Sequence, residues 1–413
     1  MRNISMPEVW INAYDYPLPD NLIAQNPLIQ RDSSRLLVFE NQKIQHKNFS
    51  DLANFIPENS MMIFNNTKVI PARVFVEKST GALIELFLLR PNAHQNLTEV
   101  LETTQSSMIW EVMVGNKKRW KLDEVLNKTI QIGSNQILVK FKWIDRELNW
   151  VEIIWEGHFT MEGVLEQIGN APLPPYMQRD SNLEDETRYQ TIFSKAIGAV
   201  AAPTASLHFS ENTFLDLEQK KVKKQYLTLH VGAGTFLPVK EENVSKHPMH
   251  REQIIVSAEF IQNLLKHTGG FIPVGTTALR ALESLYWSGV YLLEENNTLE
   301  FPLLVSKEFA YFEREFISIQ QSLENILVYM NQHSLENWII ETELLIMPGY
   351  QFRFCDALVT NFHQPKSTLL VLVSALVGSQ WIDIYQNAIE EKYRFLSYGD
   401  SSLLFNQNVP KFL

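Results

Sequence analysis

The pattern of hydrophobic and polar positions changes along the chain. From about Val74 to Gly157, short runs of alternating apolar and polar residues are separated by polar turns such as Gly133-Ser134-Asn135. Alternation with a period of two is typical of strands with one buried face, so this region predicts a small sheet or barrel. The runs are Leu83–Leu89, Ile109–Val114, Ile137–Trp143 and Trp150–Trp155.

After residue 176 the pattern alternates between strand and helix. Helices are expected where apolar residues recur with helical spacing, at Ser257–His267, at the stretch that begins with Thr276 or Thr277, and at the wholly apolar Leu369–Val377. The second helix would bury Leu279, Leu282, Leu285 and Tyr286. Strands are expected at Gln225–Val231, Phe271–Gly275, Leu344–Met347 and Phe354–Phe362.

This order of elements predicts an α/β main domain with a largely parallel sheet. Residues 1–73 and 158–413 would form this domain, and residues 74–157 would form an inserted small β-barrel domain. The proline-rich stretch 171–176, APLPPY, is expected to be an extended hinge after the insertion.

Composition narrows the class of protein. The chain has 413 residues, 45% hydrophobic and 20% charged, which is a soluble globular balance. The single cysteine, Cys355, excludes an intrachain disulfide and any multi-cysteine metal site. The N-terminus has no apolar core of signal-peptide length, and Leu369–Val377 is shorter than the ~20 residues that span a bilayer. We expect a cytoplasmic protein without a membrane partner. The net charge of −11 disfavours nucleic acid unless basic residues gather locally.

Two glycine turns could hold a ligand. Gly232, Gly234 and Thr235 follow a predicted strand, and Gly275 precedes Thr276 and Thr277 at a predicted helix start. Glycines let backbone amides approach a ligand, and free amides at a helix start suit a carboxylate or phosphate. A tight turn and an ordinary helix cap explain the two patterns equally well.

Four histidines are candidate general bases, namely His208, His230, His250 and His363. A structural role remains open for each. No pair has the H-x-x-x-H spacing of a metal site, so we expect no metal.

Polar residues at predicted strand ends are further candidates, because ligands bind at that edge of open α/β sheets. They include Asn361 and the Tyr398-Gly399-Asp400 turn, although such residues also occur in turns for local reasons. Basic clusters at 117–121 and 220–224 are either solvated surface or RNA contacts.

Taken together, these motifs resemble the S-adenosylmethionine:tRNA ribosyltransferase-isomerase family of queuosine synthesis. Matching blocks run in order along nearly the whole chain. They are Tyr14–Pro19, Leu22–Gln25, Arg31–Leu37, Asn65–Arg73, Pro172–Tyr176, Arg188–Thr191, Gly198–Ser210 (GAVAAPTASLHFS), Thr228–Phe236 (TLHVGAGTF), His247–His250, Val274–Thr277, Leu282–Ser284, Pro348–Tyr350, Thr360–Leu370 (TNFHQPKSTLL) and Tyr393–Asp400 (YRFLSYGD).

The resemblance implies an α/β domain with an inserted β-barrel. It also implies transfer and isomerisation of the ribosyl group of S-adenosylmethionine onto an aminomethyl-deazaguanine at the tRNA wobble position. The products would be epoxyqueuosine, adenine and methionine. S-adenosylmethionine is then a substrate, and no cofactor is expected.

Mapped onto the matching blocks, the implied site has three groups of residues. Catalytic residues would be His208, His230 and Asp400, with the base left open between the two histidines. The S-adenosylmethionine site would comprise Gly232, Gly234, Thr235, Gly275, Thr276 and Thr277. The tRNA or its base would meet Arg73, Tyr189, Asn361, His363, Lys366 and Tyr398, with the two tyrosines as stacking candidates.

Some positions depart from the family pattern. Ser206, Gln364 and Thr187 differ from the usual residues, and 289–340 is an extra segment where the family has a shorter connection. A paralogue that binds S-adenosylmethionine or tRNA without this catalysis is the alternative hypothesis. A methyltransferase is disfavoured because the Gly232–Gly234 turn lacks a third glycine. We expect a monomer; the role of the extra segment and the identity of the acceptor stay open.

Overall fold

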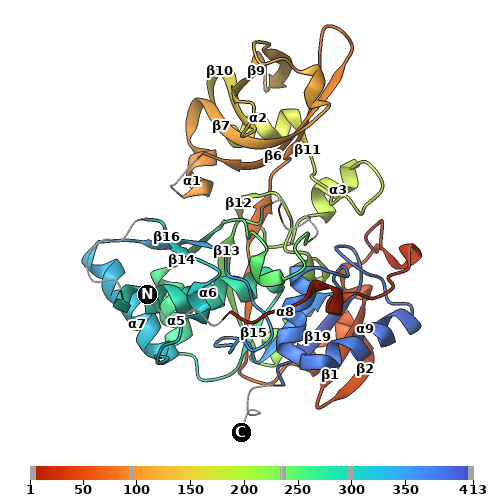
Figure 1. Cartoon of the computed structure of the whole chain (residues 1–413), viewed down its shortest axis with the longest axis vertical. Coiled ribbons are helices and arrows are strands. Elements are labelled where there is room, and N and C mark those ends of the chain that lie inside the picture. Colours follow the sequence, from red (N-terminus) through yellow and green to blue (C-terminus); the bar gives the residue numbers. More distant parts are fainter. Residues whose placement is uncertain (1–5, 93–95, 233, 235–238, 295–300, 408–413) are drawn as a thin grey trace.

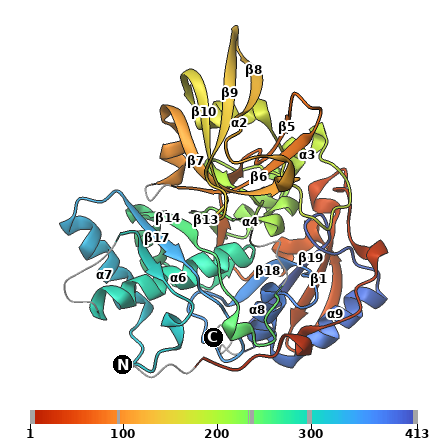
Figure 2. The same ribbon diagram turned by 45° about the horizontal axis from the view of Figure 1, so that its top comes forward.

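The computed structural model describes residues 6–92, 96–232, 234, 239–294 and 301–407. Most elements form one layered body, and a curled sheet built from residues 73–170 stands apart from it (Figure 1). The view turned by 45° shows the same arrangement (Figure 2). The protein is therefore a mixed α/β fold with several sheets.

Two sheets form the centre of the main body. The four-stranded sheet has the order β18 (Ala357–Asn361), β19 (Ser401–Phe405), β1 (Arg35–Glu40), β2 (Lys43–Asn48). The six-stranded sheet has the order β15 (Phe271–Pro273), β3 (Met61–Asn65), β13 (Lys223–Leu229), β14 (Glu252–Ser257), β17 (Asn337–Thr342), β16 (Leu303–Val305). A parallel bridge between Val274 and Val359 joins β15 to β18, so the two sheets meet where those strands end.

The prediction of a largely parallel sheet is wrong. Strand β3 pairs in parallel with β13 and β15, but β13 pairs antiparallel with β14, and β14 pairs antiparallel with β17. The chain passes from β13 to β14 without an α-helix in the residues described there. An antiparallel pair needs no crossover helix, so this connection is compatible with the antiparallel pairing.

Helices cover the sheets as the apolar spacing predicts. Helix α5 (Ala258–Leu265) is capped by Ser257, and α6 (Thr276–Glu294) packs against β13 and β3. The predicted face of α6, from Leu279 to Tyr286, is buried. The other helices of the main body are α3 (Leu183–Arg188), α4 (Glu211–Gln219), α7 (Ile319–Gln332), α8 (Thr368–Val377) and α9 (Trp381–Glu390).

Helix α8 is apolar all round, as expected for a core helix, and lies next to α9. By length and composition alone, residues 368–390 could cross a membrane, but 61% of their most apolar window is buried in the fold. Gly378 also interrupts the segment with a positive φ of 65°. These features are typical of core helices.

The extra segment 289–340 contributes α7, β16 and β17 to the main body. Helix α7 packs against α6, and Ser322 Oγ donates a hydrogen bond to Tyr286 O at 2.6 Å. A Cβ on Gly289 would collide with the backbone of Ser322. Glycine at this position therefore lets the two helices approach closely.

The predicted strand at Leu344–Met347 does not form. All four residues are buried, but side chains rather than a neighbouring strand satisfy their backbone. Arg280 Nε donates to Leu344 O, and Tyr311 OH donates to Leu345 O and accepts from Met347 N. An apolar run shows only that a segment is buried, and here the partners are side chains distant in sequence.

The curled sheet holds the strands predicted from alternation. Its order is β11 (Gly169–Asn170), β5 (Arg73–Glu77), β6 (Leu83–Pro91), β7 (Thr104–Gly115), β10 (Trp150–Thr160), β9 (Asn135–Asp145), β8 (Leu126–Ile132), with α1 (Leu97–Glu102) and α2 (Met161–Ile168) beside it. It has its own apolar core around Trp110 and Trp155. Lys128 Nζ on β8 donates to Phe75 O and Ile168 O, so a side chain links the two ends of the sheet. β12 (Ala196–Ala199) and β4 (Thr67–Val69) pair in parallel near its base.

Candidate functional site

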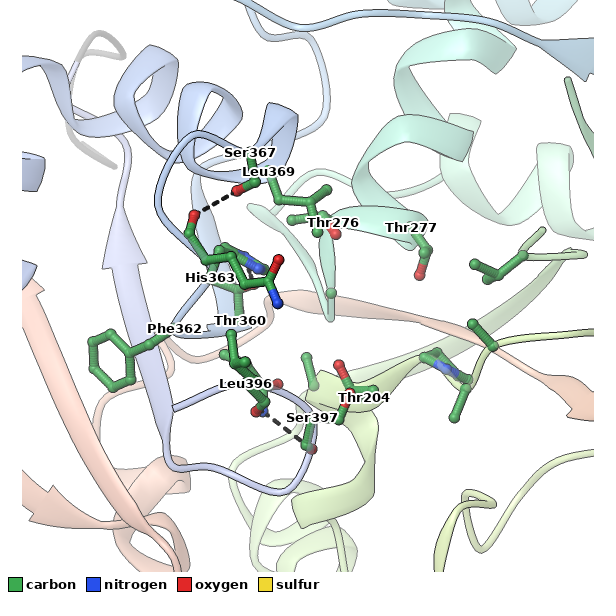
Figure 3. Close-up of a pocket in the computed structure, with 18 of the residues that line it drawn as sticks. Thr204, Thr276, Thr277, Thr360, Phe362, His363, Ser367, Leu369, Leu396 and Ser397 are labelled. Atoms are coloured by element: carbon green, nitrogen blue, oxygen red, sulfur yellow. Dashed lines mark hydrogen bonds between the residues drawn. The ribbon is translucent and has the colours of Figure 1, made fainter. Parts of the chain in front are cut away.

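A pocket with about 90 Å³ of water-accessible space lies where the two central sheets meet. Figure 3 shows Thr276 and Thr277 at the start of α6 and His363 and Ser367 on the segment that follows β18, with Thr204 and Ser397 nearby. Six predicted site residues line it, namely Tyr189, Gly275, Thr276, Thr277, Asn361 and His363.

The glycine turn before α6 forms one wall. Gly275 has φ of +88°, a conformation that side chains rarely adopt, and its N–H donates to Val359 O at 2.7 Å. This turn starts α6 directly at the pocket, where the first amides of a helix lack intrahelical partners. Thr277 Oγ1 is buried and has no hydrogen-bond partner. A buried unpaired hydroxyl beside free amides marks a position for a polar ligand group.

Asn361, at the end of β18, forms part of the opposite wall. Its Nδ2 donates to Leu396 O at 2.9 Å, which fixes the side chain. Its Oδ1 is buried without a hydrogen-bond partner. Three residues that line the pocket therefore carry a side-chain oxygen without a hydrogen-bond partner, namely Thr277, Asn361 and Tyr189.

His363 is the histidine that lines the pocket. Its Nε2 lies 3.0 Å from Thr360 Oγ1, and its backbone N donates to Tyr385 OH at 3.0 Å. Tyr16 OH donates to His363 O. Burial lowers the pKa of His363 to about 4, so the ring is neutral at pH 7 and can accept a proton or share a hydrogen bond.

His208 lies behind the pocket wall. Its Nδ1 lies 2.9 Å from Ser34 Oγ, and Asn361 Nδ2 donates to its Nε2 at 3.3 Å. Burial lowers its pKa to about 3, and the charges of Arg394 and Arg31 add to this. Both ring nitrogens are occupied by the protein, so this histidine orients Asn361.

His230 does not line the pocket either. Its Nδ1 lies 3.0 Å from Thr67 Oγ1 and its Nε2 lies 3.3 Å from Thr98 Oγ1. A Cβ on Gly198 would lie 2.7 Å from the ring, so the residues around it are closely packed. Burial lowers the pKa of His230 to about 3. The ring ties the main body to α1 of the curled sheet.

Asp400 has both carboxylate oxygens in backbone hydrogen bonds. Oδ1 accepts from Arg35 N at 2.9 Å, and Oδ2 accepts from Arg394 N at 2.8 Å. Burial raises its pKa. The residue fixes the turn before β19 and does not line the pocket.

The Gly232–Gly234 turn serves packing. A Cβ on Gly234 would collide with the ring of His250, and Gly232 N donates to Glu252 Oε1 at 3.1 Å. Neither glycine lines the pocket, although Val231 does. Thr235 lies outside the described residues. The close approach that these glycines permit is therefore to a neighbouring histidine.

The remaining candidates differ from expectation. Tyr189 and Tyr398 are buried and pack edge to face with ring centroids 5.9 Å apart, so neither ring is exposed for stacking. Lys366 Nζ pairs with Asp15 Oδ2 at 2.9 Å, and Arg73 pairs with Glu85 at 2.5 Å. Arg73 lies in a separate cleft beside the curled sheet.

Within the described ranges, no three His, Cys, Asp or Glu residues gather as metal ligands, and the absence of a metal stays a prediction.

The comparison with known proteins identifies the family. Residues 11–404 match the family described as queuosine biosynthesis protein. The chain belongs to this family. Among solved structures, it is similar to a crystal structure of an S-adenosylmethionine tRNA ribosyltransferase from Thermotoga maritima. The two share 24% identity over 94% of this chain and 99% of that chain, with a TM-score of 0.44. Because both values are low, the assignment to the queuosine biosynthesis family rests on the family match.

Several pocket residues of this family member were not singled out from the sequence. They are small or weakly polar, and include Thr204, Ser367, Leu396 and Ser397. Each lies inside one of the blocks that carry the family resemblance. Their position inside a matching block was the sequence signal that could have identified them as pocket residues. Neither residue type nor spacing distinguishes a threonine or leucine at a site from one in a loop.

Because His208 and His230 are buried neutral, stability should fall in mild acid. Each has a folded pKa near 3, below the unfolded value near 6.5, so the unfolded state binds more protons between these limits. The contribution of these two histidines to the unfolding free energy is therefore constant well above pH 6.5, and it should drop by about 1.4 kcal/mol per pH unit for each histidine below about pH 6.

Urea unfolding between pH 6 and pH 5 measures this slope. A His230→Gln variant removes one of the two groups and should lower the slope by about 1.4 kcal/mol per pH unit. Equal slopes in the two proteins would show that His230 is not held neutral.

Proposed function

We propose that this protein transfers and isomerises the ribosyl moiety of S-adenosylmethionine onto the aminomethyl-deazaguanine wobble base of tRNA. The products are epoxyqueuosine in the tRNA, adenine and methionine. The observation that supports this most directly is the uncharged pocket beside the start of α6 in a chain of the queuosine biosynthesis family.

The pocket chemistry suits a donor whose cation must lose a proton. No Asp, Glu, Lys or Arg is among the described residues that line it, and His363 is neutral at pH 7. A sulfonium held without a counter-ion is destabilised relative to water. Removal of the proton on the carbon beside the sulfur turns the sulfonium into a neutral ylide, and the positive charge passes to the group that accepts the proton.

The two pocket walls offer complementary contacts to the donor. The amides at the start of α6 and Thr277 Oγ1 suit the methionine carboxylate, because helix N-termini attract anions. Asn361 Oδ1 suits the hydroxyl or amino groups at the other end of the donor. This assignment retains Gly275, Thr276 and Thr277 as donor contacts and leaves Gly232 and Gly234 in a packing role.

We assign the proton transfer to His363. It is the histidine whose ring lines the pocket, whereas His208 and His230 have both ring nitrogens in hydrogen bonds to protein groups. Thr360 Oγ1 holds the His363 ring in place through Nε2. The proton taken from the donor could be returned to adenine as it leaves.

The test is product analysis with purified protein, S-adenosylmethionine and tRNA that carries the aminomethyl-deazaguanine. We expect free adenine and methionine, and neither product with tRNA that carries guanine at that position. Binding of tRNA without adenine release would favour the non-catalytic paralogue. S-adenosylhomocysteine in place of adenine would favour a methyltransferase.

We further infer that the curled sheet is an inserted small barrel domain, and that the protein acts as a cytoplasmic monomer without a membrane partner. The separate core around Trp110 and the Lys128 link between the sheet ends support the first statement. The burial of α8 supports the absence of a membrane partner. Size-exclusion chromatography with light scattering tests the monomer.

A further inference from the structure

A second, smaller pocket lies directly behind the candidate active site. Its water-accessible space is about 20 Å³, and its lining includes Arg31, Arg188, His208, Ser397 and Tyr398. Ser397 lines both pockets, and the hydrogen bond from Asn361 to His208 joins a residue of the first to a residue of the second. The two pockets are therefore separated by a single layer of side chains.

The arginines of this pocket are held by backbone carbonyls. Arg31 donates to Leu207 O and Thr187 O, both at 3.1 Å, and Arg188 donates to Ile29 O at 3.1 Å and Leu28 O at 2.5 Å. Carbonyl oxygens accept hydrogen bonds without neutralising a full positive charge. The guanidinium groups are thus fixed in place while their charge remains available.

Arg394 adds positive charge from beside the pocket. Its NH2 group donates to Asn26 O at 2.5 Å, and its charge contributes to the lowered pKa of His208. Arg394 NH1 and Arg188 Nε are buried and have no hydrogen-bond partner. Two donors on charged groups are therefore unsatisfied, which is costly in a protein interior unless a ligand completes them.

The neighbouring carboxylates do not balance this charge. Glu184 lies 3.6 Å from Arg188 but is 59% exposed, so solvent screens the pair. Asp185 is held by Arg179 at 2.6 Å and accepts from Tyr398 OH. Asp400 offsets part of the Arg394 charge, but the same carboxylate also interacts with Arg35, so one negative charge is shared between two arginines.

The charge of Arg188 reinforces the effect of burial in lowering the pKa of Arg31. The cluster therefore carries excess positive charge in a protein whose net charge is −11.

We propose that Arg31 and Arg188 bind a backbone phosphate of the tRNA next to the wobble nucleotide, with Arg394 strengthening the positive field. This inference rests on the proposed function, because it names the part of the substrate that the arginines contact. Each terminal guanidinium nitrogen carries two N–H groups and gives one to a backbone carbonyl, so the second N–H can be donated to a phosphate oxygen. A base bound in the first pocket would bring its own backbone to the far side of the shared wall.

The donor carboxylate is the other anion that the cluster could meet. It is better served by the start of α6, since Thr276 and Thr277 lie within the first pocket and the arginines do not. An acidic protein that binds RNA also needs a local basic site, because only charge within about 8 Å acts at physiological salt. The phosphate assignment meets that need beside the reacting base.

The experiment measures tRNA affinity against salt, without S-adenosylmethionine, for Arg188→Gln and Arg31→Gln. The matched control is Arg251→Gln, whose side chain is 49% exposed and pairs with Glu341 and Glu343. Each cluster variant should bind tRNA roughly tenfold more weakly at low salt. The slope of log K against log salt should flatten by about one unit. The control should keep the wild-type slope, and all variants should keep the wild-type KM for S-adenosylmethionine.

A loss of local folding is distinguishable from a lost phosphate contact. Arg188→Lys keeps the charge without the planar fork, so it should keep the wild-type slope while losing affinity. Partial unfolding would lower affinity in every variant and leave the slope unchanged. Unchanged slopes in both glutamine variants would overturn the proposal, and a raised KM for S-adenosylmethionine with unchanged slopes would assign the cluster to the donor instead.

Failure of the proposed function has a separate signature. If the wild-type protein releases no adenine, the ribosyl-transfer assignment is wrong. The salt dependence of tRNA binding still tests whether the arginines contact a phosphate, because this measurement needs no turnover.

Discussion

Replacing His363 with alanine is expected to reduce kcat for adenine release by about 10²–10⁴-fold, the usual loss when a proton-transfer group is removed. Its neutral ring lines the pocket, and Thr360 Oγ1 orients it at 3.0 Å. Single-turnover measurement of adenine release isolates the chemical step from product release.

The control is His158→Ala, since His158 is exposed on the curled sheet. Binding of S-adenosylmethionine by calorimetry should change little in His363→Ala if the residue acts on the proton and not on the donor as a whole. Near-normal turnover in His363→Ala, combined with a large loss in His208→Ala or His230→Ala, would return the role to the histidines first favoured from the sequence.

The second large effect concerns stability. Glu252 is fully buried and pairs with Arg280 at 2.6 Å, while Gly232 N donates to its other oxygen. Burial alone would raise the pKa of this carboxyl, but the charge of Arg280, the contact with His250 and the hydrogen bond from Gly232 N together outweigh burial and bring it to about 2. Glu252→Gln leaves the buried Arg280 without a counter-charge and should cost about 3–5 kcal/mol of unfolding free energy.

Urea unfolding at pH 7 measures this loss. Glu111→Gln is the control, because it removes the partner of the largely exposed Arg90 and should cost less than about 1 kcal/mol. The double variant Glu252→Leu, Arg280→Met should recover most of the stability, since it removes both charges from the interior. If Glu252→Gln unfolds like the wild type, the buried pair does not hold the Gly232 turn in place.

The sequence predicted helices and strands correctly where the spacing of apolar residues alone determines the element. The apolar face of α6 and helix α5 lie where the apolar spacing predicted them. The alternating runs in Val74–Gly157 form strands, because a period of two can bury only one face of a sheet. By contrast, Leu344–Met347 was apolar enough for a strand, but the side chains of Arg280 and Tyr311 donate hydrogen bonds to its backbone carbonyls in place of a neighbouring strand.

The sequence by itself determined the family and the residue types needed for the chemistry. Gly275, Thr276, Thr277, Asn361 and His363 were named in advance, and all of them line one pocket. Their motifs are local, so a strand end or helix start identifies them without knowledge of the fold.

Only the tertiary structure decided which candidates meet. His208, His230 and Asp400 resemble catalytic groups in the sequence, yet their polar atoms are bound by Ser34, Thr67, Thr98 and backbone amides far along the chain. Gly234 is a packing residue because His250 lies against it. The residue type alone sets the chemical nature of a side chain. Its hydrogen-bond partners and its access to a ligand depend on contacts between distant segments, and these contacts exist only in the folded protein, where the two sheets meet.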